Sequence, residues 1–427
     1  MIKKIMLGAL IMLLAVGVGL AATLTPMEQL GKALYQDENL SLNRNQSCKT
    51  CHHPGAGFAD PENRRDPVAF PVSDGTDPEL SGGANAPTAA YAGFSPRLDY
   101  VQDPDTGEYL WIGGMFWNGR ATGWTLDDDP LAEQAQGPFL NPREMAMDSK
   151  LAVVDEVERS KYARLFKKVF GQDAFNDIDI AYDKMARAIA AFERSQAVTR
   201  FNSRFDQFFW ACEAAGIDVS TIVVGTDLSA LPQGILTIGQ LKGLALFNDA
   251  PLALGGNGGG NCAACHSTTT ERDPQGNALY PPLFTDFSYD NLGIPTNLRL
   301  YELLNQKTPP DGGSPPDLGL GGFLASVDLE AQFPADQGYP PIDPAAENGK
   351  FKVPTLRNVA KTPPYGHNGF FASLTDIVNF YNKRDVDNIW GEAEYRDTMN
   401  DTELGDLGLS PQEVRLIVAF LHSLNDR

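Results

Sequence analysis

The chain contains the pattern Cys-x-x-Cys-His twice, from Cys48 to His52 and from Cys262 to His266. The two copies, which include Cys51 and Cys265, use four of the five cysteines and two of the five histidines. In such a pattern the thiols form thioethers to the vinyl groups of a haem, and the histidine becomes a ligand of the iron. Two copies therefore predict two covalently bound c-type haems and a protein that performs redox chemistry.

A zinc site and a disulfide framework are the alternatives for paired cysteines, since zinc sites also use Cys-x-x-Cys pairs. Neither alternative explains why a histidine directly follows both pairs. In addition, 214 residues separate Cys48 from Cys262, which exceeds the usual spacing within a zinc finger. Haem attachment is the favoured interpretation.

The first 22 residues have the parts of a secretory signal peptide. A short basic start at 1–4 precedes an apolar stretch from Ile5 to Leu20, and the small residues Ala21 and Ala22 follow. An uncleaved membrane anchor is the alternative, but the apolar stretch is short for a full span. Cleavage near Ala22 would give a periplasmic protein without an integral membrane span, either soluble or loosely attached to a surface.

The charge of the chain limits its partners. With 34 Lys and Arg against 55 Asp and Glu, the formal net charge is −21. This argues against nucleic acid, because phosphate contacts need clustered Lys and Arg. It permits electrostatic steering toward a basic protein, although a generally acidic soluble surface is an equal interpretation. Cys212, the fifth cysteine, lies in an aromatic, helix-like stretch and is expected to be a buried free thiol.

Periodic apolar residues predict a mainly α fold. The expected helices cover 157–170, 179–196, 237–248 and 410–424. Long stretches rich in glycine and proline, at 60–113, 254–260 and 308–344, predict loops and not strands.

Two haem motifs flanked by helices predict two cytochrome c-like lobes, each with one covalent haem, joined by helices and long loops. The expected division is a signal peptide at 1–22, a first lobe at 23–225 and a second lobe at 226–427. The helices between 157 and 215 are expected to lie between the two lobes.

Six further segments accompany the haem motifs in a fixed order: LGKALYQDENLS, ANAPT, FWNGRA, EQAQGPFLNPREM, LKGLALFN and KVPTLRNVAKTPPYGHNG. With these segments the chain resembles the bacterial dihaem cytochrome c peroxidase family, which includes the MauG branch. The resemblance covers nearly all of the chain after the signal peptide. It implies that peroxide reacts at the N-terminal haem, with His52 as proximal ligand. It also implies that the C-terminal haem, with His266 as proximal ligand, handles electrons.

The resemblance further assigns two residues to the peroxide pocket. Peroxide cleavage needs a group that takes a proton from one oxygen and delivers it to the other. Glu144 matches the family's catalytic glutamate, and Gln134 matches its distal glutamine. A glutamate beside haem in a partly dry pocket can have a raised pKa. From spacing alone Glu144 would be a surface acid at a helix end, and the family match favours the catalytic role.

Trp117 matches a tryptophan that the family places between the two haems as an electron relay. The sequence departs from the family here, because the 17 residues from Trp117 to Gln134 are a longer interval than usual. Trp124, ten residues before Gln134, is therefore a second candidate. The FWNGR context favours Trp117, and an ordinary core tryptophan is the alternative for both.

Three residues match positions that bind calcium between the lobes in relatives: Asn85, Thr362 and Pro364. Calcium takes oxygen ligands that include side-chain amides and backbone carbonyls, so the residue types suit it. A turn asparagine and a structural Thr-Pro-Pro loop are the alternative.

The histidine count bears on the first haem, because no histidine lies between His53 and His266. Family members that need reductive activation carry a removable distal histidine in the loop before the ANAPT segment, and residues 54–84 have none. The first haem is therefore expected to be five-coordinate or water-bound. Recruitment of His367, His422 or a methionine is the lesser alternative.

The second haem is expected to have a tyrosine ligand. Ordinary family members place a methionine fourteen residues after the PYxHxG histidine, whereas MauG-type enzymes have a tyrosine there. In this chain that position, counted from His367, is Tyr381. An anionic phenolate favours ferric and higher states, whereas a thioether favours ferrous iron. Packing of Tyr381 in the core, with another ligand, is the alternative.

Together these features predict a MauG-like dihaem enzyme that uses hydrogen peroxide to oxidise a partner, commonly a residue of another protein. A peroxide-scavenging cytochrome c peroxidase fed by a small cytochrome or cupredoxin is the first alternative. A non-enzymatic electron-transfer cytochrome with two closed, six-coordinate haems is the second. Relatives often form dimers, so a homodimer is also considered.

Overall fold

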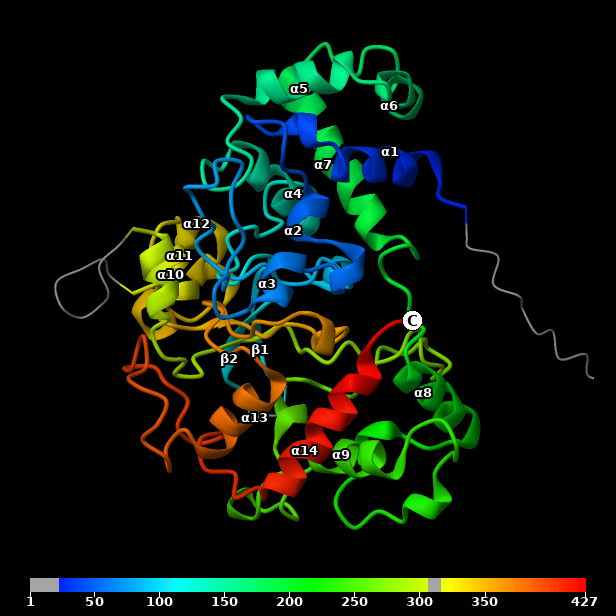
Figure 1. Cartoon of the computed structure of the whole chain (residues 1–427), viewed down its shortest axis with the longest axis vertical. Helices are drawn as coiled ribbons and strands as arrows, with labels where there is room; N and C mark the ends of the chain where they lie inside the picture. The colour runs from blue at the N-terminus through cyan, green and yellow to red at the C-terminus, as the bar shows by residue number, and fades with distance from the viewer. Residues whose placement is uncertain (1–22, 105, 306–315) are drawn as a thin grey trace, which may run out of the picture.

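The structure, a computed structural model, describes residues 23–104, 106–305 and 316–427. The expected signal peptide at 1–22 lies outside these residues. Helices dominate and the strands are short (Figure 1), which confirms the prediction of a mainly α fold. Among the described residues, no helix is both long and apolar enough to cross a membrane.

The helices are distributed along the whole described chain. They are α1 (Pro26–Tyr35), α2 (Cys48–Cys51), α3 (Pro61–Arg65), α4 (Pro130–Leu140), α5 (Lys150–Arg159), α6 (Ala163–Phe170), α7 (Ile178–Arg194), α8 (Arg204–Ala215), α9 (Ile238–Asn248), α10 (Leu298–Leu303), α11 (Gly319–Leu324), α12 (Leu329–Gln332), α13 (Leu374–Lys383) and α14 (Pro411–Leu421). Two antiparallel strand pairs join β1 (Asp99–Gln102) to β2 (Tyr109–Ile112) and β3 (Tyr289–Asp290) to β4 (Phe351–Lys352).

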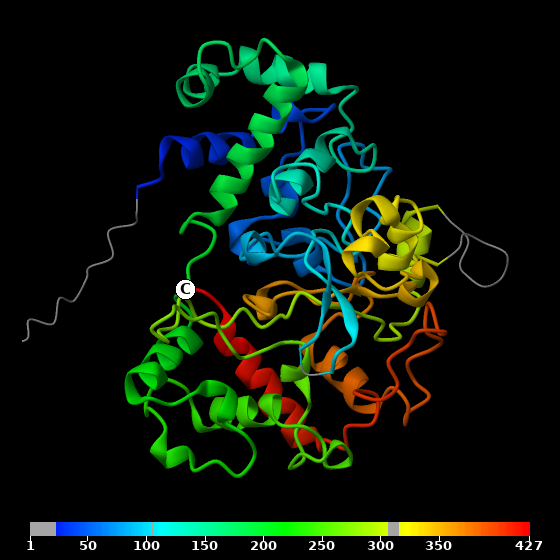
Figure 2. The same ribbon diagram turned by 180° about the vertical axis from the view of Figure 1, so that it is seen from behind.

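The buried apolar side chains form two main clusters. The first core is built mainly from α1, α4, α5, α6 and α7, and the second core from α8, α9, α13 and α14. In both views of the molecule, α5 to α7 lie at one end and α8, α9 and α14 at the other (Figures 1 and 2). The C-terminus lies where the two halves meet.

The same kind of helix crossing organises each core. Gly31 of α1 lies so close to α7 that an added Cβ would be 1.8 Å from the Ala188 carbonyl oxygen. Gly243 of α9 makes the matching approach to α14, where a Cβ would be 2.0 Å from the Leu416 carbonyl oxygen. Only glycine allows two helix backbones to come this close.

One helical turn after each glycine, an aromatic residue of the same helix packs against an aromatic residue of the partner helix. Tyr35 packs edge-on against Phe192 and Phe247 against Phe420, both with ring centroids 5.2 Å apart. Edge-to-face packing is a favoured arrangement of aromatic rings. The first and second cores are therefore two versions of one packing unit, and each includes a helix that leads to a haem motif.

Three of the four expected helices are present as α7, α9 and α14, and N-caps explain where two of them start. Thr237 accepts a hydrogen bond from the Gln240 amide, and Ser410 accepts one from the Glu413 amide. The fourth expected helix, at 157–170, is divided into α5 and α6. Ser160 donates its hydroxyl to the Val157 carbonyl at 2.7 Å, and this local bond competes with continuation of the helix.

Two other expectations differ from the structure. Helices α5 to α7 pack in the first core and do not separate the two halves. The stretch 60–113 is not all loop, since β1 and β2 lie within it, and α11 and α12 lie within 308–344. Aromatic side chains accompany the first strand pair: Tyr100 packs on Tyr109 and Trp111 across the pair, and Trp111 packs on Phe333. The glycine-rich and proline-rich composition does not indicate these contacts.

The hydrophobic clusters also bear on the division of the chain at residue 225. Phe205, Phe208 and Phe209 of α8 belong to the second core, together with Val219 and Ile222. Helix α8, which is capped at Ser203, therefore packs with the second core, and the boundary at 225 stays a prediction.

Replacing Gly243 by alanine is expected to destabilise the protein. The new methyl group would force α9 and α14 apart, and overpacking of this kind costs about 1–3 kcal/mol. The free energy of unfolding, measured by urea denaturation, should fall accordingly.

Gly239→Ala is the matched control on the same helix. Its Cβ would meet the Leu416 Cδ2 atom at 3.6 Å and the Thr237 Oγ1 atom at 3.9 Å, both ordinary contacts. This variant should be neutral or slightly stabilised because alanine favours the helix. Equal stability of the two variants would contradict the role of the glycine crossing.

Candidate haem-binding site

Both haem motifs form a single turn of helix that ends at the histidine. Cys48 and Cys51 begin and end α2, and the His52 amide donates to the Cys48 carbonyl at 2.8 Å. In the second motif Cys262 begins a 3₁₀ turn, and the His266 amide donates to the Cys262 carbonyl at 2.9 Å. Residues three apart on such a turn lie on one face, so each motif presents two thiols side by side.

Each motif histidine bonds through Nδ1 to the backbone carbonyl of a phenylalanine. The distance is 3.2 Å from His52 to Phe58 and 3.0 Å from His266 to Phe284. A carbonyl can only accept, so Nδ1 carries the proton and Nε2 keeps the lone pair that a metal needs. The Pro87 and Pro354 carbonyls also interact with the His52 and His266 rings. Both phenylalanines have positive φ, 62° and 56°, a rare backbone conformation for a bulky residue that turns the carbonyl toward the ring.

Burial keeps the donor atoms of both motifs uncharged. It lowers the pKa of His52, and it lowers the pKa of His266 to about 4. It also raises the pKa of the Cys51 and Cys262 thiols to about 12. A neutral imidazole is the form that ligates iron.

A large cavity lies over the second motif. It encloses about 1790 Å³ of space, part of which is open to solvent. Cys262, Cys265 and His266 line it, and Tyr381 of α13 lines it as well. Burial and then the nearby Cys262 raise the pKa of Tyr381. The structure thus brings the predicted distal tyrosine and the predicted proximal histidine to one cavity.

Trp117 reaches the same cavity from the other half of the molecule. Its indole N–H donates to the Asn85 carbonyl at 2.8 Å, and its own carbonyl accepts the Lys352 amide at 2.8 Å. Trp124 instead donates to the Leu98 carbonyl and packs on Phe333 in a separate aromatic cluster. Of the two candidates, the structure places Trp117 beside the second haem motif.

Glu144 lies near the first motif. Burial is the main cause of its raised pKa, while the Arg120 guanidinium and a 2.7 Å bond from the Asn141 side chain oppose the rise. Beyond the larger effect of burial, its charge also contributes to the raised pKa of Cys48 and Cys51. The structure therefore brings a carboxyl group with a raised pKa within electrostatic range of the first haem motif.

Gln134 is half-buried on α4, and the turn that carries Glu144 follows the end of this helix. Its neighbour Glu133 accepts the Gly123 amide at 2.7 Å, and its neighbour Ala135 packs in the first core. Within the described chain, no hydrogen bond joins Gln134 to Glu144. Gln134 and Glu144 therefore lie on one helix and the turn that follows it, without a hydrogen bond between their side chains.

The three predicted calcium residues converge between the two halves and all line the cavity. The Asn85 side-chain nitrogen donates to the Pro364 carbonyl at 2.7 Å, and Thr362 donates to the Val359 carbonyl at 3.1 Å. A calcium ion would need the amide oxygen of Asn85 to face Pro364, which requires the amide to be turned over.

The remaining histidines are engaged elsewhere or exposed. His53 accepts the Gly55 amide at 3.0 Å, and His422 lies exposed at the end of α14. His367 lines the second cavity, where its Nε2 atom is 3.1 Å from Glu394. None of them is placed at Glu144.

These features fit two c-type haems better than zinc. Over the described residues, the one cluster of close metal-ligating atoms joins Cys265 to Asp290 and Glu403 and includes neither motif histidine. None of the five cysteines forms a disulfide. The Nδ1 atom of His367 is buried without a partner, although the side chain lines the cavity. A bound group with polar edges would satisfy such an atom.

Sequence reasoning missed several residues of these sites. Arg120 follows Trp117 in the FWNGRA segment, and its guanidinium lies 3.6 Å from the centre of the Phe116 ring. Lys352 opens the KVPT segment, and burial lowers its pKa to about 8. The motif context could have pointed to both. The carbonyls of Phe58 and Phe284 have no side-chain signal in the sequence.

Comparisons with known proteins agree with this geometry. Residues 25–213 match the family model described as di-haem cytochrome c peroxidase. The methylamine utilization protein MauG of Paracoccus denitrificans is 32% identical over 411 residues, which are 93% of this chain and 88% of the relative. The cytochrome c551 peroxidase of Nitrosomonas europaea is 26% identical, over 93% of this chain and 79% of its own.

Solved structures show the same relationship. The dihaem peroxidase BthA of Burkholderia thailandensis superposes with a TM-score of 0.69 at 27% identity, over 95% of this chain and 89% of that one. A MauG-like protein associated with microbial copper homeostasis superposes with a TM-score of 0.56 at 22% identity, over 95% and 90% of the two chains. The second likeness supports the fold alone.

Paired thiols, a neutral imidazole beside each pair, and similarity along nearly the whole chain lead to one conclusion. The chain belongs to the di-haem cytochrome c peroxidase family that includes MauG, and it is a dihaem oxidoreductase.

Proposed function

We propose that the protein is a periplasmic enzyme that takes hydrogen peroxide at the first haem site and oxidises a protein partner through the second, as a MauG-like enzyme. The observation that carries the MauG-like part is Tyr381. It lines the second cavity with His266, and no methionine is among the described residues that line it.

When bound, the two haems supply iron that exchanges single electrons. The residues of the chain then have separate tasks. Cys48, Cys51, Cys262 and Cys265 hold the two groups, and His52 and His266 offer Nε2 to them. The Tyr381 oxygen would be offered to the second group from the same cavity as His266.

Glu144 is the proposed proton carrier for peroxide. Reduction of hydrogen peroxide to two water molecules consumes two electrons and two protons. Glu144 takes a proton from the near oxygen of peroxide and delivers it to the leaving oxygen, and Gln134 orients the bound peroxide. Burial raises the pKa of Glu144, which brings its proton exchange closer to neutral pH.

Trp117 is the proposed path for the electrons. The partner loses two electrons, which travel one at a time from the second site to the first. Trp117 lines the second cavity and bonds to the Asn85 carbonyl of the first half, which supports a place on the path between the two sites. The indole N–H is held by a backbone carbonyl, which is too weak a base to remove the proton from an oxidised ring.

Several further features belong to the same proposal. They are two cytochrome c-like lobes, a calcium ion at Asn85, Thr362 and Pro364 between them, export after removal of residues 1–22, and a homodimer.

A peroxide-scavenging peroxidase remains the second candidate, since the Nitrosomonas europaea relative bears that name over 93% of this chain. Steady-state turnover of peroxide with a reduced small cytochrome or cupredoxin separates the two functions. The MauG-like proposal expects slow turnover, and fast turnover would refute it. Electron paramagnetic resonance of the oxidised protein tests the electron-transfer alternative, because a pure carrier would show no high-spin ferric signal.

Replacing Glu144 by glutamine is expected to slow the reaction with peroxide by at least about 100-fold, the usual contribution of an acid–base group. In the wild type the rate should fall as pH drops through a pKa above the ordinary value of 4.5, because the carboxylate is the required base. Stopped-flow absorbance after addition of peroxide measures both effects.

Asp148→Asn is the control, since Asp148 is an exposed acid in the segment that follows Glu144. Its haem content and peroxide rate should equal those of the wild type. An unchanged rate in Glu144→Gln at full haem content would show that another group moves the proton.

Replacing Tyr381 by methionine is expected to raise the reduction potential of the second haem, because a thioether favours ferrous iron more than a phenolate does. Spectroelectrochemical titration measures this potential. Tyr365→Phe is the matched control, since Tyr365 lines the same cavity but donates its hydroxyl to the Val359 carbonyl at 3.0 Å. Potentials that respond equally to both substitutions would argue against ligation by Tyr381.

A further inference from the structure

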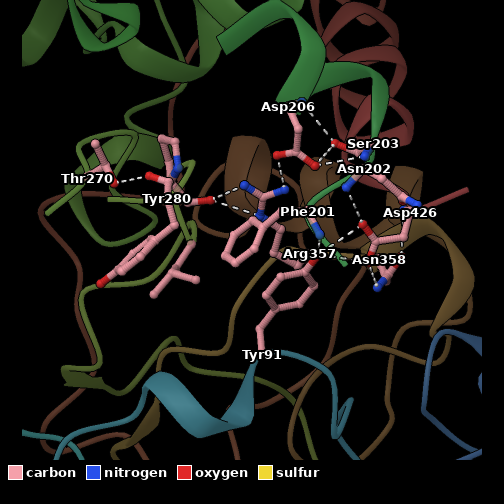
Figure 3. A network of polar contacts seen from close by, with 12 residues as sticks. Tyr91, Phe201, Asn202, Ser203, Asp206, Thr270, Tyr280, Arg357, Asn358 and Asp426 are labelled. Carbon is pink, nitrogen blue, oxygen red and sulfur yellow. Dashed lines mark hydrogen bonds and ion pairs between the residues drawn. The ribbon is translucent and has the colours of Figure 1, made fainter. Parts of the chain in front are cut away.

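A buried arginine lies at the junction of the two halves, close to the backbone segment that bonds to the second motif histidine. The Arg357 side chain is 0% exposed and pairs with Asp206 of α8, which is 1% exposed, at 2.5 Å (Figure 3). The second carboxylate oxygen of Asp206 accepts both the amide and the hydroxyl of Ser203, at 2.8 and 2.7 Å. Burying two charges is expensive even when they are paired, so stability alone does not explain this arrangement.

Arg357 also holds the backbone segment that orients His266. We define residues 282–284 as the second carbonyl segment, since it ends in the Phe284 carbonyl that accepts His266 Nδ1. The Nε and Nη2 atoms of Arg357 both donate to the Pro282 carbonyl, at 2.8 and 2.5 Å. The guanidinium lies 5.5 Å from the centre of the Phe284 ring.

A second side chain fixes the middle of the same segment. The Thr355 hydroxyl donates to the Leu283 carbonyl at 2.6 Å. Leu283 packs in the first core, whereas Phe284 packs in the second. The second carbonyl segment therefore crosses the junction of the two halves, and Arg357 and Thr355 determine where its carbonyls point.

The other half of the molecule closes the pocket around Arg357. The guanidinium lies 5.4 Å from the Tyr91 ring and 4.9 Å from the Phe201 ring. Tyr91 donates its hydroxyl to Asp426 at the C-terminus, at 2.8 and 2.9 Å from its two oxygens, and accepts the Phe201 amide at 2.9 Å (Figure 3).

In the first half, the cation that bonds to the loop before Phe58 is exposed and not buried: Arg64 donates to the Gly55 carbonyl at 2.6 Å. The Phe58 carbonyl, which accepts His52 Nδ1, also accepts the Ala89 amide at 2.9 Å. Thr88 donates to the Gly57 carbonyl at 2.6 Å, as Thr355 does in the second half. The first half contains Ala86-Pro87-Thr88, and the second half contains the corresponding segment Val353-Pro354-Thr355. Two residues after the threonine, the first half has Ala90 and the second half has Arg357.

We propose that Arg357 is a positioning residue that acts through the second carbonyl segment on His266 and thereby tunes the second haem site alone. By fixing the Phe284 carbonyl, it keeps the Nδ1–H···O bond short, which makes His266 Nε2 a more electron-rich ligand. Such a ligand stabilises the ferric state and lowers the reduction potential. The inference rests on the proposed function in that it requires a haem at His266, and it does not require peroxide chemistry.

Arg357→Lys and Thr355→Val test this proposal without changing the formal charge. Lysine can pair with Asp206 but cannot also make the two-fold bond to Pro282. Valine removes the Thr355 hydroxyl, which donates to the Leu283 carbonyl and accepts the Arg357 amide at 3.1 Å. In both variants the reduction potential of the second haem should rise. For Arg357→Lys we expect about a tenfold change in the reduction equilibrium, which is about 59 mV for one electron. The first haem should keep its potential.

Spectroelectrochemical titration of each haem in the purified holoprotein, without peroxide or partner, gives these values. Arg272→Lys is the matched control, because Arg272 also pairs with an acid of α8, Glu213, but lies far more exposed and does not contact the second carbonyl segment. It should leave both potentials unchanged.

The outcomes are distinct. If the variants unfold at a lower temperature but the second haem keeps its wild-type reduction potential, Arg357 only stabilises the fold and the proposal is overturned. An equal shift at both haems would also overturn it, because the effect would then come from the docking of the two halves. If Arg357→Lys fails to fold, Thr355→Val decides. A wild-type protein with no haem at His266 would refute the proposed function itself.

Discussion

The hydrogen bond from each motif histidine to a phenylalanine carbonyl is the contact on which the two sites depend. It fixes the proton on Nδ1 and leaves Nε2 of His52 and His266 free. Phe58 and Phe284, whose carbonyls face the rings, both adopt positive φ, and Thr88 and Thr355 hold the segments around them. Backbone geometry of this kind is costly and persists only when the surrounding packing determines it.

The two halves repeat one plan and then differ where function requires it. Each has a glycine crossing, an edge-to-face aromatic pair, a haem motif and a threonine that holds the carbonyl segment. The differences lie around the motifs. Glu144 and Arg120 accompany the first motif, whereas Tyr381 and the buried Arg357 accompany the second. The same packing unit thus carries the proposed proton-transfer site in one half and the proposed electron-transfer site in the other.

Much of the fold followed from local sequence. Capping residues such as Thr237 and Ser410 and the apolar period located α9 and α14, because these signals act over a few residues. The break between α5 and α6 was missed, since a single serine side chain, Ser160, competes for a backbone carbonyl there. The position of α8 in the second core was also missed, because its aromatic residues could pack in either half and only long-range contacts decide between them.

The sequence by itself determined the chemistry of attachment, since Cys-x-x-Cys-His is a local pattern and needs no tertiary contact to be recognised. It also placed Glu144, Trp117 and Tyr381 as candidates through their motif context. Only the tertiary structure decided that Trp117 and not Trp124 lines the second cavity, and that Arg357 bonds to the segment whose Phe284 carbonyl accepts His266. These relations join residues from opposite halves of the chain, and long-range packing, which no local pattern encodes, brings them together.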